Sequence, residues 1–331
     1  MEIGLKFTSP QTTSRSDAIE LFARADQLGY HSLWAGERFA PDLFLTLAEM
    51  AFRTERILLG SAVVNVFSRT PAAVATAAAT LDQMSQGRLL LGLGVSGRVV
   101  VEDWHGLPFD RPYQRLREYV EIIRQIIGSW RVQHEGEVLQ VGGQVIEMTP
   151  LRDRIPTYIG ALGPKAIRLT GEIGDGWIPV MNAPDAMQGD FGELLAGATS
   201  ANRDVKDVTV APDVLVLVTD DKPGARRLMR STMARSMSGR GAYFGDRAAR
   251  AGFPEEVGRV IDLWRRRKRQ EAVDVISDQM VDAFCLYGSR EEILEGLEHR
   301  RSAGWGVPLI RFPAEATLEQ VFQTIEALAP R

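Results

Sequence analysis

Cysteine and histidine are scarce in this chain of 331 residues, which contains one cysteine and four histidines. Cys285 has no partner for an intrachain disulfide, as is usual for proteins of a reducing compartment. The histidines (His31, His105, His134 and His299) show no paired spacing to one another or to the cysteine. The sequence therefore predicts neither a disulfide framework nor a metal site.

Long apolar runs and an excess of basic residues are missing as well. No apolar run reaches the roughly 18 residues that a membrane-spanning helix needs. The formal net charge of −4 argues against a nucleic-acid-binding protein, which needs a basic face. The N-terminal residues MEIGLKF follow a strand pattern and not that of a signal peptide. We therefore expect a cytoplasmic protein without affinity for membranes or nucleic acids.

Several catalytic signatures are also missing. The first strand–helix turn has no G-x-G-x-x-G fingerprint, and the chain has neither a G-x-S-x-G elbow nor a glycine-rich loop ending in Lys-Ser or Lys-Thr. The nearest match to the fingerprint, GLGVSG at residues 92–97, follows the fourth predicted strand and is a weak signal.

The pattern that the chain does show is a regular alternation of strands and helices. Residues 56–97 form one unit of it: an apolar strand, an alanine-rich helix that begins at Pro71 and is closed by Gly87, and a second apolar strand. We expect strands at residues 2–8, 30–36, 56–65, 88–94, 155–160, 175–180, 207–220 and 308–312. We expect helices from Ser14, at residues 41–53, 71–87, 113–130, 163–173 and 184–200, from Ser289, and at residues 317–328.

Eight strands, each followed by a helix, predict an α/β fold of the (β/α)8 TIM barrel type. We expect one domain over residues 1–331, with a helical insertion at 221–280 after the seventh strand and a possible hairpin within 131–155. A doubly wound open sheet is the alternative, but it would have fewer strands for this length.

In such a barrel, functional residues follow the carboxyl ends of the strands. The residues at these positions include Thr8, Glu37, Arg38, Asn65, Arg69, Ser96, Gly97, Arg98, Glu102, Asp103, Ala161, Leu162, Gly163, Met181 and Asn182.

The segment at residues 159–177, IGALGPKAIRLTGEIGDGW, predicts a helix start that is rich in glycine. Free backbone N–H groups and the helix dipole at such a start bind phosphate, and Lys165 adds a cation. An ordinary strand–helix loop is the alternative interpretation.

Five stretches together resemble the bacterial luciferase-like family: GYHSLWAGERF, RILLGSAVVN with TPAAVATAAATLDQMSQGRLLLGLGVSG, FDRPYQRLREYVEIIRQI, IGALGPKAIRLTGEIGDGW and SREEILEGLEHRRSAGWGVPLIRFP. They span nearly the whole chain in the family's order. The resemblance is greatest to the branch that uses coenzyme F420, a 5-deazaflavin, and that includes the methylenetetrahydromethanopterin reductases.

The resemblance implies the same barrel with an insertion after the seventh strand, and a homodimer. It implies a non-proline cis peptide bond within residues 60–63, with Ala62–Val63 as the expected position, behind the deazaflavin ring. It also implies a phosphate site at Gly160 to Lys165. The cofactor-binding residues expected from it are Phe7, Thr8, Glu37, Ser61, Ala62, Val63, Asn65, Val95, Ser96, Gly97, Gly160, Ala161, Leu162, Gly163, Pro164 and Lys165.

The chain departs from its relatives after the second strand. Many relatives have an acidic residue followed by histidine there, whereas this chain has Glu37 followed by Arg38. The guanidinium of Arg38 stays protonated, so it cannot act as a base. We expect Glu37 and Arg38 to be the catalytic pair, with Arg38 neutralising a reduced deazaflavin or an acidic substrate. A plain ion pair at the strand end is the alternative.

The resemblance implies hydride transfer between coenzyme F420 and a small organic substrate. A luciferase-like monooxygenase that uses FMN is one alternative, and a barrel that binds a flavin or a partner without turnover is another. The insertion is a possible lid, although its bulky residues also suit core packing.

Overall fold

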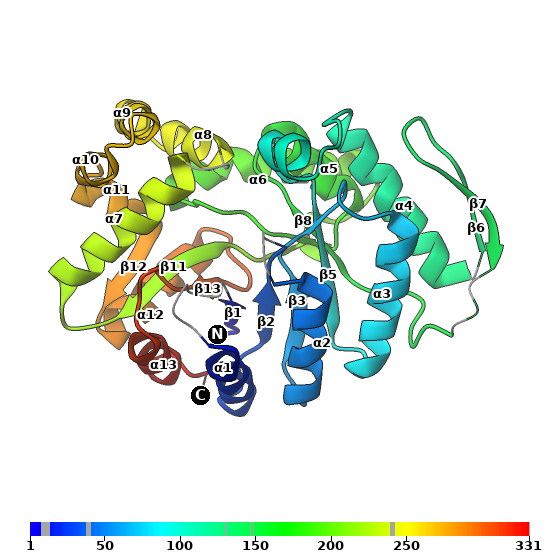
Figure 1. Cartoon of the computed structure of the whole chain (residues 1–331), viewed down its shortest axis with the longest axis horizontal. Helices are drawn as coiled ribbons and strands as arrows, with labels where there is room; N and C mark the ends of the chain where they lie inside the picture. Colours follow the sequence, from blue (N-terminus) through cyan, green and yellow to red (C-terminus); the bar gives the residue numbers. More distant parts are fainter. Residues whose placement is uncertain are drawn as a thin grey trace. The chain divides into compact units, whose positions relative to one another are not determined.

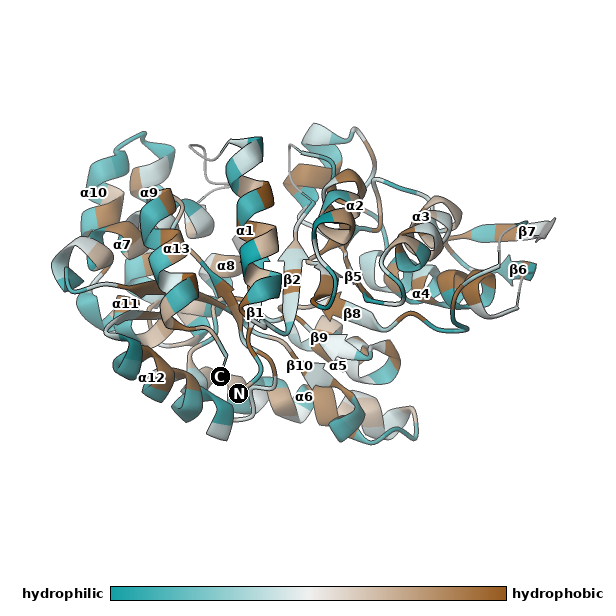
Figure 2. Cartoon of the chain, turned by 90° about the horizontal axis from the view of Figure 1, so that it is seen from below, coloured by the Kyte–Doolittle hydropathy of each residue, from teal (hydrophilic) through white to brown (hydrophobic). Residues whose placement is uncertain are grey.

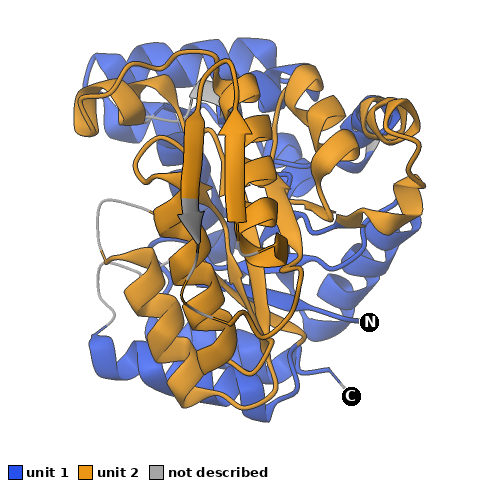
Figure 3. Cartoon of the chain, turned by 90° about the vertical axis from the view of Figure 1, so that its right-hand side faces the viewer, with its two compact units in different colours: residues 1–30, 179–192, 210–331 blue, residues 31–178, 193–209 orange. Residues whose placement is uncertain are grey.

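The computed structural model describes residues 1–7, 14–37, 41–129, 131–145, 147, 149–238 and 242–330 (Figure 1). The chain divides into two compact units, which Figure 3 distinguishes by colour. Unit 1 comprises residues 1–30, 179–192 and 210–331, and unit 2 comprises residues 31–178 and 193–209. The expectation of one domain over the whole chain stays a prediction.

Unit 2 is built on parallel strands in the order β2-β3-β5-β8-β9, and β4 pairs with the end of β5. Helices α2 and α3 pack beside β3 and β5 (Figure 1). The strands are β2 (Ser32–Ala35), β3 (Leu58–Ser61), β4 (Val64–Asn65), β5 (Leu89–Gly94), β6 (Arg131–Glu135), β7 (Gln140–Val145), β8 (Thr157–Gly160) and β9 (Gly176–Trp177). The helices are α2 (Leu43–Arg53), α3 (Pro71–Met84), a π-helical turn (Val100–Trp104), α4 (Pro112–Ser129), α5 (Pro164–Ile173) and a 3₁₀ turn (Val205–Asp207).

The possible hairpin within residues 131–155 is confirmed, because β6 and β7 pair antiparallel. Glu118 of α4 holds the turn that joins them. Its buried carboxylate accepts hydrogen bonds from the backbone N–H groups of Glu137, Val138 and Leu139 and from the side chain of Gln114. Burial alone would raise the pKa of Glu118, but these hydrogen bonds outweigh it, so that the pKa is lowered.

Unit 1 contains the parallel strands β1, β13, β11 and β12, paired in that order. The strands are β1 (Gly4–Phe7), β11 (Asp213–Val218), β12 (Cys285–Gly288) and β13 (Leu309–Arg311). The helices are α1 (Arg15–Gln27), a 3₁₀ turn (Pro184–Ala186), α7 (Lys222–Ser238), α8 (Ala242–Arg250), α9 (Pro254–Arg265), α10 (Arg269–Asp274), α11 (Asp278–Phe284), α12 (Arg290–Ser302) and α13 (Leu318–Ala327). Helix α6 (Met187–Ser200) and strand β10 (Thr209–Val210) each begin in one unit and end in the other.

The helix starts follow the capping chemistry of the sequence. Ser14 and Ser289 each form a reciprocal capping box with an acidic residue three positions on, Asp17 and Glu292. The apolar residues Ala18, Leu21, Phe22 and Ala25 of α1 are buried, and the alternating hydropathy of α1 and α13 is visible in Figure 2. Local sequence therefore decides where these helices begin and which side they bury.

Two predicted strands need correction, and one strand was missed. The strand expected at 207–220 is interrupted at Ala211–Pro212, because proline has no N–H for a ladder, and it divides into β10 and β11. The strand expected at 175–180 is reduced to β9, and Pro179 interrupts its second half. Strand β12 was not predicted, since its four residues directly follow α11 without a turn signal.

The described residues between β11 and β12 form α7 to α11. The helical insertion expected at residues 221–280 stays a prediction. No helix in the described ranges is both long and apolar enough to cross a bilayer.

Candidate functional site

The candidate site begins in unit 2 where β3 ends. The peptide bond between Ala62 and Val63 is cis, at the position expected from the sequence, and it separates β3 from β4. The hydroxyl of Ser61 is fully buried. It donates to the carbonyl oxygen of Gly92 at 2.9 Å and accepts from the N–H of Gly92 at 2.7 Å. Ser61 therefore fixes the end of β3 to the middle of β5.

Glycines on the neighbouring strands make room for this segment. A Cβ atom at Gly92 would lie 1.8 Å from the carbonyl oxygen of Ser61, and one at Gly94 would lie 2.6 Å from a methyl group of Val63. A Cβ atom at Gly160 would lie 3.0 Å from the other methyl group of Val63. Gly92 and Gly94 of the 92–97 stretch therefore allow residues 61–63 to pack closely, so the faint resemblance of that stretch to a phosphate loop has a steric explanation.

Glu37, just beyond β2, uses both carboxylate oxygens within unit 2. Oε2 accepts from the backbone N–H of Asn65 at 2.6 Å and from the hydroxyl of Ser68 at 3.3 Å. Oε1 accepts from Nε of Arg69 at 3.1 Å. The structure thus brings Glu37 and Asn65 together, as the sequence predicted, and it gives Glu37 a holding role in the turn after β4.

Arg69 continues this network to helix α2. Its guanidinium also pairs with Asp42, the residue that caps α2, and it lies over the ring of Phe44 at 5.2 Å. Burial alone would raise the pKa of Asp42, but the N–H of Leu45 and the guanidinium of Arg69 outweigh it and lower the pKa. The buried Tyr119 donates to the carbonyl oxygen of Arg69 at 3.0 Å.

Asn65 ends β4 and is 5% exposed. Its side-chain oxygen accepts from the N–H of Phe67 at 3.0 Å. Its side-chain amide nitrogen Nδ2 is buried and has no hydrogen-bond partner among the described residues. An unpaired buried donor is costly, about 1–3 kcal/mol, so this group at a strand end is a candidate for contact with a ligand.

The loop after β5 packs on the loop after β4 through a column of four side chains. Phe67 and Phe109 stack with ring centroids 5.2 Å apart. Arg115 lies 4.8 Å over Phe67, and Arg98 lies 5.1 Å over Phe109. We call these four residues the arginine–phenylalanine column. It was not predicted, because its paired residues lie 11 to 48 positions apart and gave no local pattern.

Val95, Ser96 and Gly97 follow β5 directly and are half-buried, and Ser96 adopts a positive φ of 59°. The π-helical turn comes next, and such turns are frequent at functional sites. Glu102, one of the residues expected beyond the carboxyl end of β5, pairs with Arg98 at 2.6 Å and is exposed.

Residues Gly160 to Lys165 lead from β8 into α5, as predicted. The carbonyl oxygen of Ala161 accepts a hydrogen bond from the buried indole of Trp177 at 2.9 Å, which fixes the start of the loop. Gly163 occupies the N-cap position and offers no side-chain acceptor to the first turn. A Cβ atom at Gly163 would meet nothing within 4 Å, and Lys165 is exposed. The first turn of α5 is thus open to an anion.

Three predicted residues are not part of the group described in unit 2. Phe7 belongs to unit 1 and packs edge-on against Phe22 of α1 with ring centroids 5.0 Å apart. Thr8 and Arg38 lie outside the described residues.

Unit 1 contains a buried polar cluster of its own. Arg247 of α8 pairs with Asp190 at 2.8 Å and donates to the side-chain oxygen of Asn182 at 3.0 Å. All three residues are at least nine-tenths buried. The cluster ties the helical insertion to the segment that follows β9.

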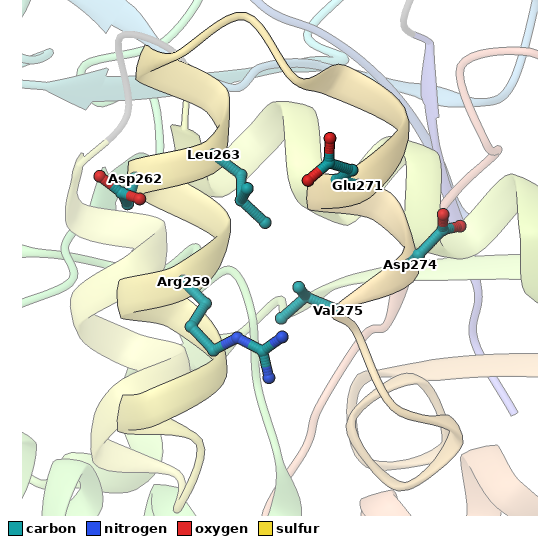
Figure 4. A pocket seen from close by; sticks show the side chains of 6 residues that line it. All are labelled: Arg259, Asp262, Leu263, Glu271, Asp274 and Val275. Carbon is teal, nitrogen blue, oxygen red and sulfur yellow. The ribbon is translucent and has the colours of Figure 1, made fainter.

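The insertion also has a cleft of about 470 Å³ between α9 and α10, shown in Figure 4. Arg259, Asp262, Glu271 and Asp274 line it together with Leu263 and Val275. Residues 265–269 nearby form a basic run, RRRKR. In it Arg266 pairs with Asp262, Lys268 pairs with Glu271, and Arg269 lies 3.9 Å over Trp264. These pairs agree with a solvated helix surface.

Residues 1–305 match the family of luciferase-like monooxygenases. A relative from Mycobacterium tuberculosis, named "Putative coenzyme F420-dependent oxidoreductase Rv3520c", is 33% identical over 323 residues, which cover 92% of this chain and 93% of the relative. A 5,10-methylenetetrahydromethanopterin reductase from Archaeoglobus fulgidus is 27% identical over 85% of this chain and 84% of its own.

A solved structure, the coenzyme F420-dependent tetrahydromethanopterin reductase from Methanopyrus kandleri, superposes with a TM-score of 0.86 at 22% identity. The match covers 99% of this chain and 98% of the other. The fold prediction, a (β/α)8 TIM barrel, is confirmed by this likeness together with the parallel strands of both units. The chain belongs to the luciferase-like monooxygenase family, as the resemblance of its five motifs predicted.

Proposed function

We propose that this protein is a coenzyme F420-dependent oxidoreductase that transfers a hydride between the deazaflavin and a small organic substrate. The observation that carries the proposal is the buried, unpartnered amide nitrogen of Asn65 at the carboxyl end of β4. Several of the relatives are named for coenzyme F420, and the residues expected to hold this cofactor fit a planar, phosphate-bearing group.

The cofactor ring would lie against residues 61–63. Ala62 and Val63 are half-buried and apolar, and glycines behind them allow the backbone to approach closely. Nδ2 of Asn65 would donate to a carbonyl oxygen of the ring. When bound, the deazaflavin supplies two-electron hydride chemistry at the carbon that replaces N5 of a flavin.

The phosphate of the cofactor would lie at the first turn of α5. The free N–H groups of that turn, its dipole and Lys165 all favour a negative charge. Because Gly163 leaves open space above the turn, a phosphate approaches without displacing a side chain.

We assign Glu37 a positioning role in place of the predicted catalytic one. Both of its oxygens are engaged, and its bond to the N–H of Asn65 orients that residue. The network from Asp42 through Arg69 to Glu37 holds the amide of Asn65 in place while substrate and cofactor bind.

A fluorescence titration tests the proposal with three probes: coenzyme F420, its riboflavin-level deazaflavin fragment without the phosphate, and FMN. We expect saturable quenching by coenzyme F420 and tenfold or greater selectivity over FMN. Asn65→Asp keeps the acceptor for Phe67 and removes the donor. It should weaken both deazaflavins at least tenfold.

Lys165→Met is the matched variant for the phosphate. It should weaken coenzyme F420 severalfold and leave the fragment unchanged. A purified protein that binds FMN in preference would instead support the monooxygenase alternative. Binding of coenzyme F420 without oxidation or reduction across a panel of alcohols, imines and enones would support a barrel without turnover.

A further inference from the structure

Arg311 is the last residue of β13 and one of two cationic residues that share a buried carboxylate in unit 1. Its Nε donates to Oδ1 of Asp213 at 2.8 Å, and Nζ of Lys6 donates to Oδ2 at 2.7 Å. The side chain of Asp213 is 3% exposed, and those of Lys6 and Arg311 are each 12% exposed. Burial disfavours the Asp213 carboxylate, but the two cations outweigh this and lower its pKa to about 2. The carboxylate therefore stays ionised at neutral pH.

The strand register places both cations toward the carboxyl ends of the strands. Asp213 and Gly4 both pair with Leu309, so Lys6 and Arg311 lie two residues further along the strands than Asp213. Two residues of strand correspond to about 7 Å. This is the side of a parallel sheet or barrel on which ligands bind.

The guanidinium of Arg311 has hydrogen-bond donors that Asp213 does not use. Among the described residues, Asp213 is its hydrogen-bond partner through Nε, and Nη1 and Nη2 have none. Arginine is suited to bidentate binding of a carboxylate or phosphate, and a bond through Nε leaves much of its fork unused. Since the side chain is partly exposed, a small ligand has access to these donors.

We propose that Nη1 and Nη2 of Arg311 bind a carboxylate or phosphate group of the substrate, and that the substrate is therefore anionic. The assignment of this anion to a substrate rests on the function proposed above, whereas the anion site itself rests on the geometry of unit 1 alone. Asp213 orients the guanidinium and Lys6 adds positive charge beside it. The first turn of α5, the expected phosphate site, belongs to unit 2.

The test is a thermal-shift titration with sodium acetate and inorganic phosphate at constant ionic strength, balanced with chloride. The wild-type protein should show a saturable rise in Tm with either anion. Arg311→Gln should weaken the apparent affinity at least tenfold, whereas Arg311→Lys should keep part of the response. Asp213→Asn removes a negative charge beside the site, so it should bind the anion severalfold more tightly even if it lowers the Tm. A purely structural triad would not produce this opposite change.

Two control variants distinguish binding at Arg311 from binding at other anion sites. Arg301→Gln alters an exposed arginine of α12 that pairs with Glu298, and it should leave the response unchanged. Lys165→Met alters the first turn of α5 and should also leave the acetate response intact. If the response is absent from the wild type, or follows Lys165 and not Arg311, the inference is wrong.

A second acetate titration, with saturating coenzyme F420, tests whether Arg311 binds the substrate or the cofactor. We expect the same acetate affinity with and without the cofactor. Competition between the two would assign Arg311 to the acidic tail of the cofactor and overturn the inference. If coenzyme F420 does not bind at all, the proposed function fails, while the acetate titration still reports on Arg311.

Discussion

At the scale of single residues, Gly92 is a position of the candidate site that has no room for a side chain. An added Cβ would lie 1.8 Å from the carbonyl oxygen of Ser61, which is backbone and has no rotamer to change. Gly92→Ala should therefore destabilise the protein by about 3 kcal/mol or more, measured by urea unfolding.

Gly258→Ala is the matched control, since it lies in α9, is exposed and has nothing within 4 Å of its added Cβ. It should stabilise the protein by roughly 0.5–1 kcal/mol through helix propensity. Equal effects of the two substitutions would contradict the steric role of Gly92.

At the scale of elements, Glu118 joins the β6–β7 hairpin to α4. Because its folded-state pKa is lowered, its contribution to stability is present above its unfolded pKa of about 4.3 and is lost as pH falls through the folded value. Glu118→Gln should cost about 2–3 kcal/mol at pH 7, since three backbone N–H groups lose a charged acceptor.

The difference in unfolding free energy between wild type and Glu118→Gln should shrink as the pH falls below about 4. Glu121→Gln, on the same helix and about half exposed, should stay within about 0.5 kcal/mol of wild type. A Glu118→Gln effect that does not change with pH would exclude the charged hydrogen bonds as its cause.

Arg247 is the corresponding anchor of α8. Arg247→Met leaves the carboxylate of Asp190 buried without its cation, and we expect a loss of about 3–5 kcal/mol. Adding Asp190→Leu should recover part of that loss, because the unpaired charge is then gone. Arg250→Met, an exposed position on the same helix, is the control. Because Arg247 fixes α8, a lid movement of the insertion would have to involve its other helices.

Elements with strong local signals were predicted well, and weakly marked ones were not. Helices α1, α3 and α12 have side-chain caps that the sequence displays. Strand β12 has no such signal, and its pairing with β11 depends on contacts about 70 residues apart. Pro212 was visible in the sequence, but the apolar residues on both sides of it favoured one long strand.

For the candidate site, residues next to strand ends were predictable and their partners were not. The barrel rule and the family resemblance led to Glu37, Asn65 and Lys165. The bonds from Glu37 to residues 65–69 and the spare donors of Arg311 arise only when distant strands come together.

At the scale of the whole molecule, the single cysteine reports on global opening. Cys285 is 2% exposed, and burial raises the pKa of its thiol to about 12. At pH 8 the native protein should react with a disulfide reagent at least 100-fold more slowly than the urea-unfolded chain, measured by absorbance of the released thiolate. Ser302→Cys, an exposed position in α12, should add one thiol that reacts at once. Rapid reaction of the native wild type would show local opening near β12.

The arginine–phenylalanine column has a consequence for redesign of the enzyme. The loops after β4 and β5 share Arg98, Phe67, Phe109 and Arg115 as one stacked set. If the loop after β5 were replaced by that of a relative, residues 98 and 109 would change, whereas the other members of the column, Phe67 and Arg115, would not. Substrate preference should therefore be exchanged with both loops transplanted together, as a single cassette that also carries the first turns of α4.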